Sequence, residues 1–312
     1  MSNETNTISA ETPQVGRSLW ADACRRLWKD KAAMLCLLVI LIYIGIAAIT
    51  PLTFGDDNWN TLHDYDNSNA VPGQSYWLGA DIFGRSVITK TFLGARTSLE
   101  VSFWANMTAI PLGMLIGVCA GYYGGRIDAF IVWVFTTMTC IPSLIRLIAI
   151  KFAFRELDDP HILWGLVNLQ GLGGLVIALS ITSWIGTCRL VRAETMRLRE
   201  ADYVMASKCC GRGSFSILIR HIMPNLMHLA IINFSLGFVG VITAEVMLSY
   251  LGLGVQDAPS WGKMINNANM DLVVGRWWEL AAATGAMFFI VLAWSIFGDR
   301  LRDALDPKLK NV

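Results

Sequence analysis

Charged side chains are scarce in this sequence. Of its 312 residues, 16% are charged and 54% are apolar, whereas an ordinary soluble domain carries about 25% charged residues. The formal net charge is only +1, which gives little electrostatic basis for binding a polyanion. The composition therefore predicts a membrane protein and argues against nucleic acid as a partner.

Motifs for catalysis and for nucleotide binding are also missing. No G-x-x-x-x-G-K-[ST] occurs, and the one Gly-Lys pair, Gly262-Lys263, is followed by Met264, so nothing in the chain can cradle nucleotide phosphates. H-E-x-x-H, C-x-x-C and G-x-S-x-G are absent as well, and the four histidines are scattered. We therefore expect no catalytic residue, no metal site and no cofactor in this chain, and any nucleotide-derived energy must come from a partner chain.

Long apolar runs are present instead. A membrane-spanning helix needs about 20 mostly apolar residues, and six runs satisfy this, at 32–52, 99–120, 128–150, 172–191, 226–251 and 279–298. The predicted fold class is all-α, a polytopic membrane protein with six transmembrane helices. The first run is too long for a signal peptide and should stay in the membrane. Before it, residues 1–31 have the pattern of a polar tail followed by an interfacial amphipathic helix.

Lysine and arginine are distributed unevenly between the connections. The two tails, the 121–127 turn and the 189–220 loop hold 17 of them, and the other three connections hold seven. The positive-inside rule then places both termini and the central loop in the cytoplasm. The resulting division is a cytoplasmic tail at 1–31, a first helix and outer segment at 32–98, a five-helix core at 99–298 and a cytoplasmic tail at 299–312.

The connection at 192–224, between the fourth and fifth runs, is a charged island with two helical stripes. The first stripe is Leu198, Ala201, Met205 and Cys209. The second, which Ser214 would cap and Pro224 would end, is Phe215, Leu218, Ile219 and Ile222. Gly211 and Gly213 separate them. A plain solvated loop and a helix-turn-helix DNA reader share this outline.

Several segments resemble one family of membrane proteins. Met205-Ala206-Ser207, followed by Gly211 and Pro224, resembles the EAA-type loop of the membrane subunits of bacterial ABC importers, although Met205 stands where that loop has an acid. Further landmarks of the peptide-transport branch occur in order at 78–85, 94–99, 121–128, 141–143, 248–254, 259–262 and 298–307. The chain thus resembles the OppC/DppC-like permease subunits of di- and oligopeptide ABC importers.

The resemblance implies a permease subunit in the bacterial cytoplasmic (inner) membrane that forms half of a peptide pathway, with membrane lipid around it. It also implies three kinds of partner: a second homologous permease subunit, two ATPase subunits that bind ATP and Mg, and an extracytoplasmic peptide-binding protein. The 195–215 coupling helix would contact an ATPase, and the expected coupling residues are Glu200, Ala201, Asp202, Tyr203, Ala206, Ser207, Gly211 and Pro224.

Two alternatives stay open. The same importer class handles other substrates, such as a nickel complex, an antimicrobial peptide or a glycan peptide. A self-contained channel or carrier would instead use the central loop only as a regulatory surface. An intramembrane enzyme is disfavoured because the runs contain no clustered nucleophile, base or metal ligand.

Charges inside the runs are costly and are therefore functional candidates. Arg146 and Glu245 should lie at the same depth if both runs are straight helices. We hypothesise that they pair, or that Arg146 meets a peptide carboxylate with Glu245 near the amino end; simple snorkelling of each to the headgroups is the alternative. Asn233, Ser235 and Thr243 complete the candidate pathway. Pro142, Gly237 and Gly240 are expected kink or close-packing points.

Overall fold

The computed structural model describes residues 19–54, 64–156, 161–162, 167–255 and 258–305. The predicted polar tail and the last residues of the C-terminal tail lie outside these ranges. Its elements are α1 (Leu19–Lys29), α2 (Lys31–Phe54), η1 (Tyr65–Asn67), α3 (Val87–Tyr123), α4 (Gly125–Cys140), α5 (Ser143–Arg155), β1 (His161–Ile162), β2 (Val167–Asn168), α6 (Leu172–Leu198), α7 (Asp202–Cys209), α8 (Ser214–Ile217), η2 (Leu218–Ile222), α9 (Met223–Tyr250), α10 (Trp261–Val273) and α11 (Trp278–Leu305). The two short strands pair antiparallel.

The described part of the chain is all-α apart from this small hairpin. Five helices are long and apolar enough to cross a membrane: α2, α3, α6, the continuous run from α8 through α9, and α11. The bent pair α4–α5 brings the number to six if it counts as one span. The all-α class is confirmed, with five to six candidate spans.

The third predicted span, 128–150, is not one straight helix. It breaks at Ile141 and Pro142, and α4 and α5 meet at 93°. Pro142 has no N–H to donate and disfavours the helical conformation in the residue before it, and Ile141 is accordingly extended at φ −89°, ψ 125°. The expected kink is therefore a full break. The membrane depth of a residue after position 142 therefore cannot be estimated by counting residues along one straight helix.

Two helices differ from the sequence prediction in extent. α3 begins at Val87, well before residue 99, and its 37 residues correspond to about 55 Å at 1.5 Å per residue. α10 lies in a stretch for which no helix was predicted. Ser260 caps it by accepting a hydrogen bond from the Lys263 backbone N–H at 3.3 Å. Trp261, Met264 and Ala268 form its buried face.

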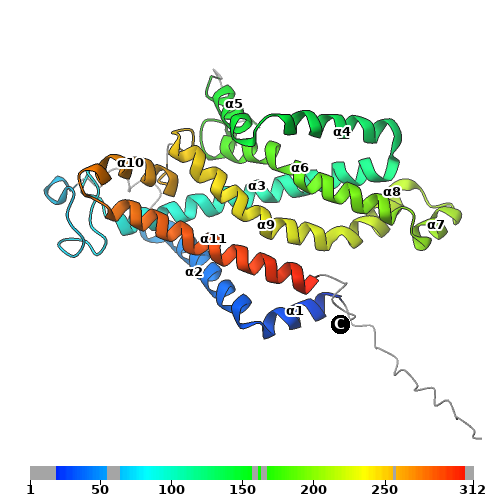
Figure 1. Cartoon of the computed structure of the whole chain (residues 1–312), viewed down its shortest axis with the longest axis horizontal. Coiled ribbons are helices and arrows are strands. Elements are labelled where there is room, and N and C mark those ends of the chain that lie inside the picture. Colours follow the sequence, from blue (N-terminus) through cyan, green and yellow to red (C-terminus); the bar gives the residue numbers. More distant parts are fainter. Residues whose placement is uncertain (1–18, 55–63, 157–160, 163–166, 256–257, 306–312) are drawn as a thin grey trace, which may run out of the picture.

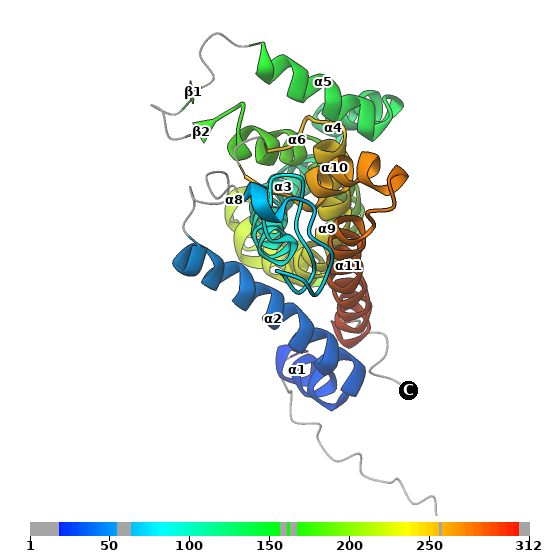
Figure 2. The same cartoon turned by 90° about the vertical axis from the view of Figure 1, so that its left-hand side faces the viewer.

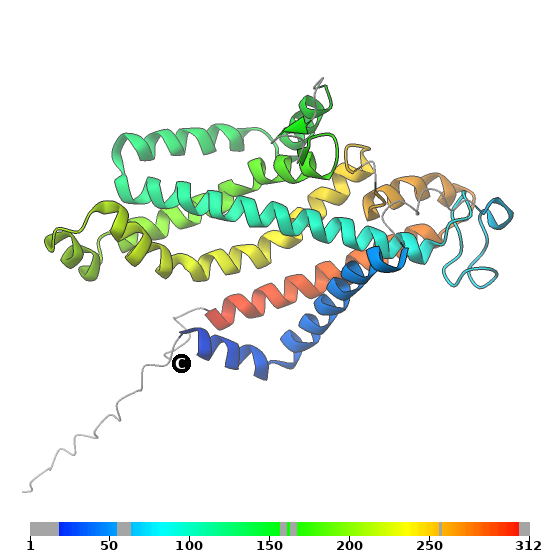
Figure 3. The same ribbon diagram turned by 180° about the vertical axis from the view of Figure 1, so that it is seen from behind.

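The helices form an elongated bundle with two distinct ends (Figure 1). α3, α6 and α9 lie together along the long axis, with α4 and α5 on one side and α2 and α11 on the other. Viewed along the bundle, α3, α6 and α9 are central (Figure 2). We call the extremity formed by α7 and α8 the α7–α8 end. The opposite extremity, formed by α10 and residues 64–86, is the α10 end; the view from behind shows both (Figure 3).

A row of glycines brings α3 against α6. Gly113, Gly117 and Gly121 recur every four residues and so share one face of α3. A Cβ added at each would lie 2.6–2.7 Å from a carbonyl oxygen of α6, closer than any real side chain comes. The two backbones therefore approach as in the small-xxx-small packing of membrane helices. Sequence analysis missed this seam, although its four-residue spacing was visible.

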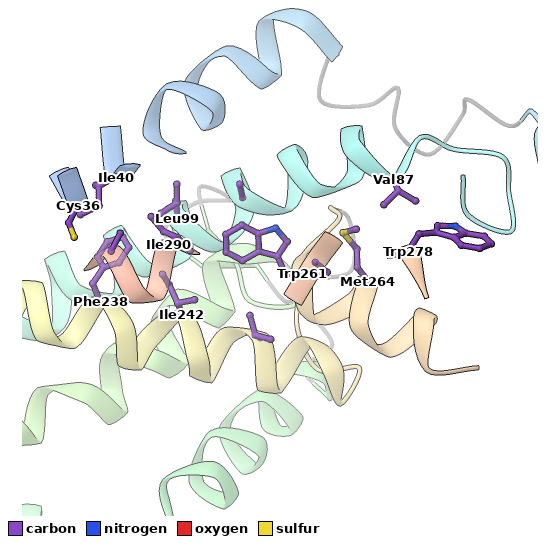
Figure 4. Packing of buried hydrophobic residues seen from close by; sticks show 14 residues of the cluster. Cys36, Ile40, Val87, Leu99, Phe238, Ile242, Trp261, Met264, Trp278 and Ile290 are labelled. Carbon is purple, nitrogen blue, oxygen red and sulfur yellow. The ribbon is translucent and has the colours of Figure 1, made fainter. Parts of the chain in front are cut away.

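A hydrophobic core cluster joins α2, α3, α9, α10 and α11 (Figure 4). Trp261 at its centre is fully buried, and its indole N–H donates to the Thr91 carbonyl at 3.0 Å. Phe238 of α9 stacks on Trp294 of α11 with ring centroids 3.9 Å apart. The Tyr43 hydroxyl donates to the Ala286 carbonyl at 2.8 Å, which ties α2 to α11. The flanking helices are thus attached to the central three.

Candidate functional site

The α7–α8 end presents apolar side chains on its surface. The exposed fractions are 41% for Tyr203, 55% for Met205, 73% for Phe215 and 49% for Ile219. We call these four residues the apolar patch. Exposed apolar patches on proteins mark interaction surfaces.

The predicted coupling residues lie on or beside α7, except Pro224 in the first turn of α9. Ala201 is the N-cap of α7, and Gly211 follows the helix with φ +77°, a conformation that favours glycine. Of the remainder, Ser207 is half-buried, and the exposed ones are Glu200, Asp202, Tyr203 and Ala206.

The two predicted apolar stripes are only partly correct. In α7 the buried residue is Val204, while Met205 and Cys209 are exposed. The reason is that α6 ends at Leu198 and α7 begins afresh at Asp202, so the helical phase does not continue between them. In the second stripe Leu218 and Ile222 are buried, but Phe215 and Ile219 are exposed. Gly213, not Ser214, is the N-cap of α8.

Pro224 does not end the second helix, as the sequence predicted. The chain passes from α8 through a π-helical turn, η2, directly into α9. In that turn the Met223 N–H donates to the carbonyl of Leu218, five residues earlier. Pro224 has no N–H, so the ordinary bond to the fourth residue before it cannot form, and a π turn is one way to absorb this loss.

Buried contacts anchor the α7–α8 end to the bundle. Val204 and Ile217 are almost completely buried in a cluster with Val118 of α3, Val191 of α6 and Leu226 of α9. Because these side chains are closely packed, a displacement of α7 acts on the adjoining ends of three long helices at once.

Polar contacts add to this anchoring. The Asn225 amide donates to the Tyr203 hydroxyl at 3.2 Å and to the His221 carbonyl at 2.7 Å. Ser207 lies within hydrogen-bonding distance of the His221 ring, at 3.4 Å. The Lys208 ammonium lies 5.2 Å from the centre of the Tyr122 ring, within range of a cation–π interaction. α7 is thereby tied to the start of α9 and the end of α3.

A cavity of about 350 Å³ lies between α3, α5, α6 and α9 and is lined by both apolar and polar side chains; we call it the polar cavity after the latter. Polar groups inside apolar spanning helices are costly and are functional candidates by default. The polar side chains that line this cavity are Asn106, Ser143, Arg146, Thr182, Ser183, Thr187 and Asn233. Arg146 and Asn233 of the five candidate pathway residues therefore border one space.

Arg146 compensates for the break in the third span. Its Nη1 donates to the carbonyl of Met138, the group that a residue at 142 would bond in a continuous helix. Pro142 cannot make that bond, and the guanidinium replaces it. The Nε of Arg146 is buried and has no hydrogen-bond partner in the described residues, so donor capacity remains beside the cavity. The Met138 carbonyl thus satisfies one donor of the guanidinium, and the side chain also borders the cavity.

The other candidate pathway residues lie elsewhere. Glu245 is fully buried and accepts hydrogen bonds from Ser98 and Ser249, both at 2.7 Å. The described contacts contain no ion pair between Glu245 and Arg146, so the hypothesis that these two residues pair stays a prediction. Ser235 is buried beside Gly298 of α11. Thr243 is exposed and donates to the Val239 carbonyl of its own helix.

The expected close-packing points also differ from one another. A Cβ at Gly237 would lie 2.6 Å from the Asn106 side-chain oxygen, whereas a Cβ at Gly240 would meet nothing within 4 Å. Gly237 thus packs closely against α3, and Gly240 borders the cavity without a close neighbour.

A buried ion network fastens the α10 end. The Lys90 ammonium bonds Asp81 at 2.9 Å and also bonds Glu279 of α11, and Arg85 bonds Asp81 at 2.9 Å. Burial alone would raise the pKa of Asp81, but the charge and hydrogen bond of Lys90, the backbone N–H of Arg85 and the charge of Arg85 outweigh it and lower that pKa. The sequence did not reveal this network, because Glu279 is 189 residues from Lys90 in the chain.

The fold and these sites define a class of protein. Long apolar helices surround a polar cavity, and short helices at one end expose apolar side chains, as expected of a membrane transport subunit that works with a partner. No group of three or more His, Cys, Asp and Glu side chains in the described residues could hold a metal ion.

Comparison with known proteins identifies the family. Residues 109–311 match the binding-protein-dependent transport system inner membrane component, and residues 18–72 match the N-terminal transmembrane domain of oligopeptide transport permease C. The chain therefore belongs to the OppC/DppC family of ABC transporter permease subunits. The predicted family, the transport rather than enzymatic role and the multi-pass membrane location are confirmed.

Three relatives align over nearly the whole chain. The dipeptide transport system permease protein DppC of Bacillus subtilis (strain 168) is 34% identical over 100% of this chain and 92% of its own length. The oligopeptide transport system permease protein OppC of the same organism is 32% identical, over 94% and 91%. The glutathione transport system permease protein GsiD of Pectobacterium atrosepticum is 31% identical, over 95% and 93%.

Proposed function

We propose that this chain is the permease subunit of an ABC importer for di- or oligopeptides and forms half of its pathway. Relatives named for dipeptide, oligopeptide and glutathione transport support a peptide substrate. All three substrates carry amide bonds and at least one carboxylate, which suits a cavity with one guanidinium and several hydroxyl and amide groups.

The proposed topology has both termini and the α7–α8 end in the cytoplasm and the α10 end outside. The excess of Lys and Arg in the two tails and the central loop supports it. In this topology α6 and α9, which both line the cavity, cross the membrane between these two sides.

In the proposed coupling mechanism, each of two ATPase subunits binds ATP and Mg²⁺, and one of them receives α7 and the apolar patch in a groove. Closure of the ATPases moves α7, and the packing of Val204 and Ile217 passes this movement to α3, α6 and α9. The cavity between those helices then changes its access. The anchored helix with an exposed apolar patch is the observation that carries this proposal.

The pathway is proposed to be completed by a second homologous permease subunit, and an extracytoplasmic binding protein delivers the peptide at the α10 end. Arg146 and Asn233 contact the substrate from this subunit's side. Ser235, Thr243 and Glu245 stay candidates whose contribution must come from another conformation or from the partner's side of the pathway.

Reconstitution tests the proposal. The complete importer in proteoliposomes, with binding protein outside and ATP inside, should accumulate a labelled dipeptide, and omission of either ATP or the ATPases should abolish uptake. Uptake by this chain alone would favour a self-contained channel or carrier. Uptake of a nickel complex or a glycan peptide in place of simple peptides would assign a different substrate within the same class.

A further inference from the structure

A second cavity, of about 430 Å³, lies beside the connection between α9 and α10. It falls within the size range of small-ligand sites. Two cations from α5 line it, and the rest of its lining comes from the hairpin region and the α9–α10 connection. The described residues that line it are Lys151, Arg155, Gln170, Gly252, Leu253 and Gly254.

Lys151 is buried and has no charged partner among the described residues. It is 5% exposed, and its ammonium makes one hydrogen bond in the described part of the chain, to the Gln170 carbonyl at 3.4 Å. An ammonium has three donors, and a buried charge is costly unless it is paired and fully hydrogen-bonded. Snorkelling does not explain this residue, because a snorkelling lysine exposes its charged group.

Arg155 adds a second positive charge for which the described residues provide no acidic partner. It follows Lys151 by four residues and so lies on the same face of α5, where like charges repel. No described carboxylate forms an ion pair with either residue, and α5 itself carries three basic residues and no acid. The end of a helix attracts one cation, which accounts for Arg155 but not for the buried Lys151.

We propose that this Lys151–Arg155 cavity binds the C-terminal carboxylate of the peptide as it enters the pathway. A carboxylate supplies the charge and acceptor atoms that both side chains lack, and every free peptide has one whatever its sequence. Arg146 lies on the same helix, five residues before Lys151, and borders the polar cavity, so a third cation is available further along. This inference rests on the proposed peptide import and adds which group of the peptide this chain recognises.

The first test measures binding without transport. The purified complex of permease and ATPase subunits, free of binding protein, is heated with alanyl-alanine or with its C-terminal amide. We expect the free acid to raise the Tm of the wild type, because a ligand that binds the folded state stabilises it, and the amide to leave it unchanged. Equal shifts with the two probes, or no shift with the free acid, would overturn the inference.

Variants tie the effect to this cavity. Lys151→Met should abolish the shift caused by the free acid, and Lys151→Arg should retain it. Arg155→Gln changes an exposed residue and provides the same test if Lys151→Met does not assemble. Arg276→Gln, which removes a cation paired with Asp271 outside the cavity, should respond as the wild type does. A normal response of both Lys151→Met and Arg155→Gln contradicts the proposal.

Uptake then separates this inference from the proposed function. In proteoliposomes Lys151→Met should reduce the preference for free acid over amide about tenfold or more, the loss expected for a charged hydrogen bond. If the wild type takes up no peptide at all, the import function fails, while the Tm measurement still decides whether the cavity binds a carboxylate. If peptides are taken up but acid and amide shift the Tm equally, only this inference fails.

Discussion

At the α7–α8 end, Val204 and Ile217 are held by apolar contacts with three helices, and four of the exposed side chains are apolar as well. At the α10 end, Lys90 is held by two buried carboxylates, one before α3 and one on α11. Apolar contacts are non-directional and can slide, whereas buried ion pairs require fixed geometry. The difference suggests that the first end transmits movement while the second keeps α3 and α11 in place.

The largest expected effect is on the ion network. Lys90→Met leaves the carboxylates of Asp81 and Glu279 buried without their shared partner, and breaking a buried pair in this way costs about 3–5 kcal/mol. We expect loss of assembled protein, measured as the yield of monodisperse complex and its Tm. Arg96→Met removes a partly exposed cation of the same helix and should have little effect. If the two variants behave alike, the α10 end is not held by this network.

The next effect concerns the glycine seam between α3 and α6. Gly117→Val places a Cβ 2.7 Å from the Cys188 carbonyl oxygen, and overpacking of this kind costs about 1–3 kcal/mol. The measurement is again Tm, with Gly45→Val as the control, since a Cβ there meets nothing within 4 Å. A tolerated Gly117→Val with normal uptake would mean that α3 and α6 can separate without harm.

The sequence predicted the apolar spans well because length and hydropathy alone determine whether a helix can cross a membrane. It predicted a kink or close-packing point at Pro142 but neither the full break of 93° nor the contact in which Arg146 donates to the Met138 carbonyl. Nor could it predict which residue of α7 is buried, because the break between Leu198 and Asp202 resets the helical phase. A stripe of apolar residues predicts the buried face only within one uninterrupted helix.

The candidate functional residues divide in a similar way, into those that a local motif predicts and those that only tertiary packing brings together. The predicted coupling residues came from a local motif, and four of the eight lie in the short helix α7. Lys90, Asp81 and Glu279 meet only through tertiary packing, as do Lys151 and the α9–α10 connection. Single positions of this kind carry no periodic signal, so the sequence did not show which side chains they contact.

A smaller effect is expected for the apolar patch. Phe215→Ser removes an exposed side chain, so the stability of the chain itself should hardly change. The loss should appear as an affinity for the ATPase subunits about tenfold lower, the size expected for an aromatic residue at the centre of an interface. Trp77→Ser removes an exposed aromatic residue near the α10 end and should not alter ATPase binding. Equal losses in the two variants would remove the functional distinction between the ends.

The smallest effect is the pH dependence contributed by Asp81. Its pKa is lower in the folded protein than in the unfolded chain, so the unfolded state binds the proton more readily. The stabilisation is therefore complete above the ordinary Asp pKa of about 4 and is lost as the pH falls through the lower folded value. Asp81→Asn should be less stable than the wild type at pH 7, and the gap should narrow in acid. Asp66→Asn, at an exposed position of the same segment, controls for general charge effects. A gap that stays constant from pH 7 to strongly acidic conditions would mean that the ionised carboxylate of Asp81 does not hold the α10 end in place, and that its hydrogen bonds alone do.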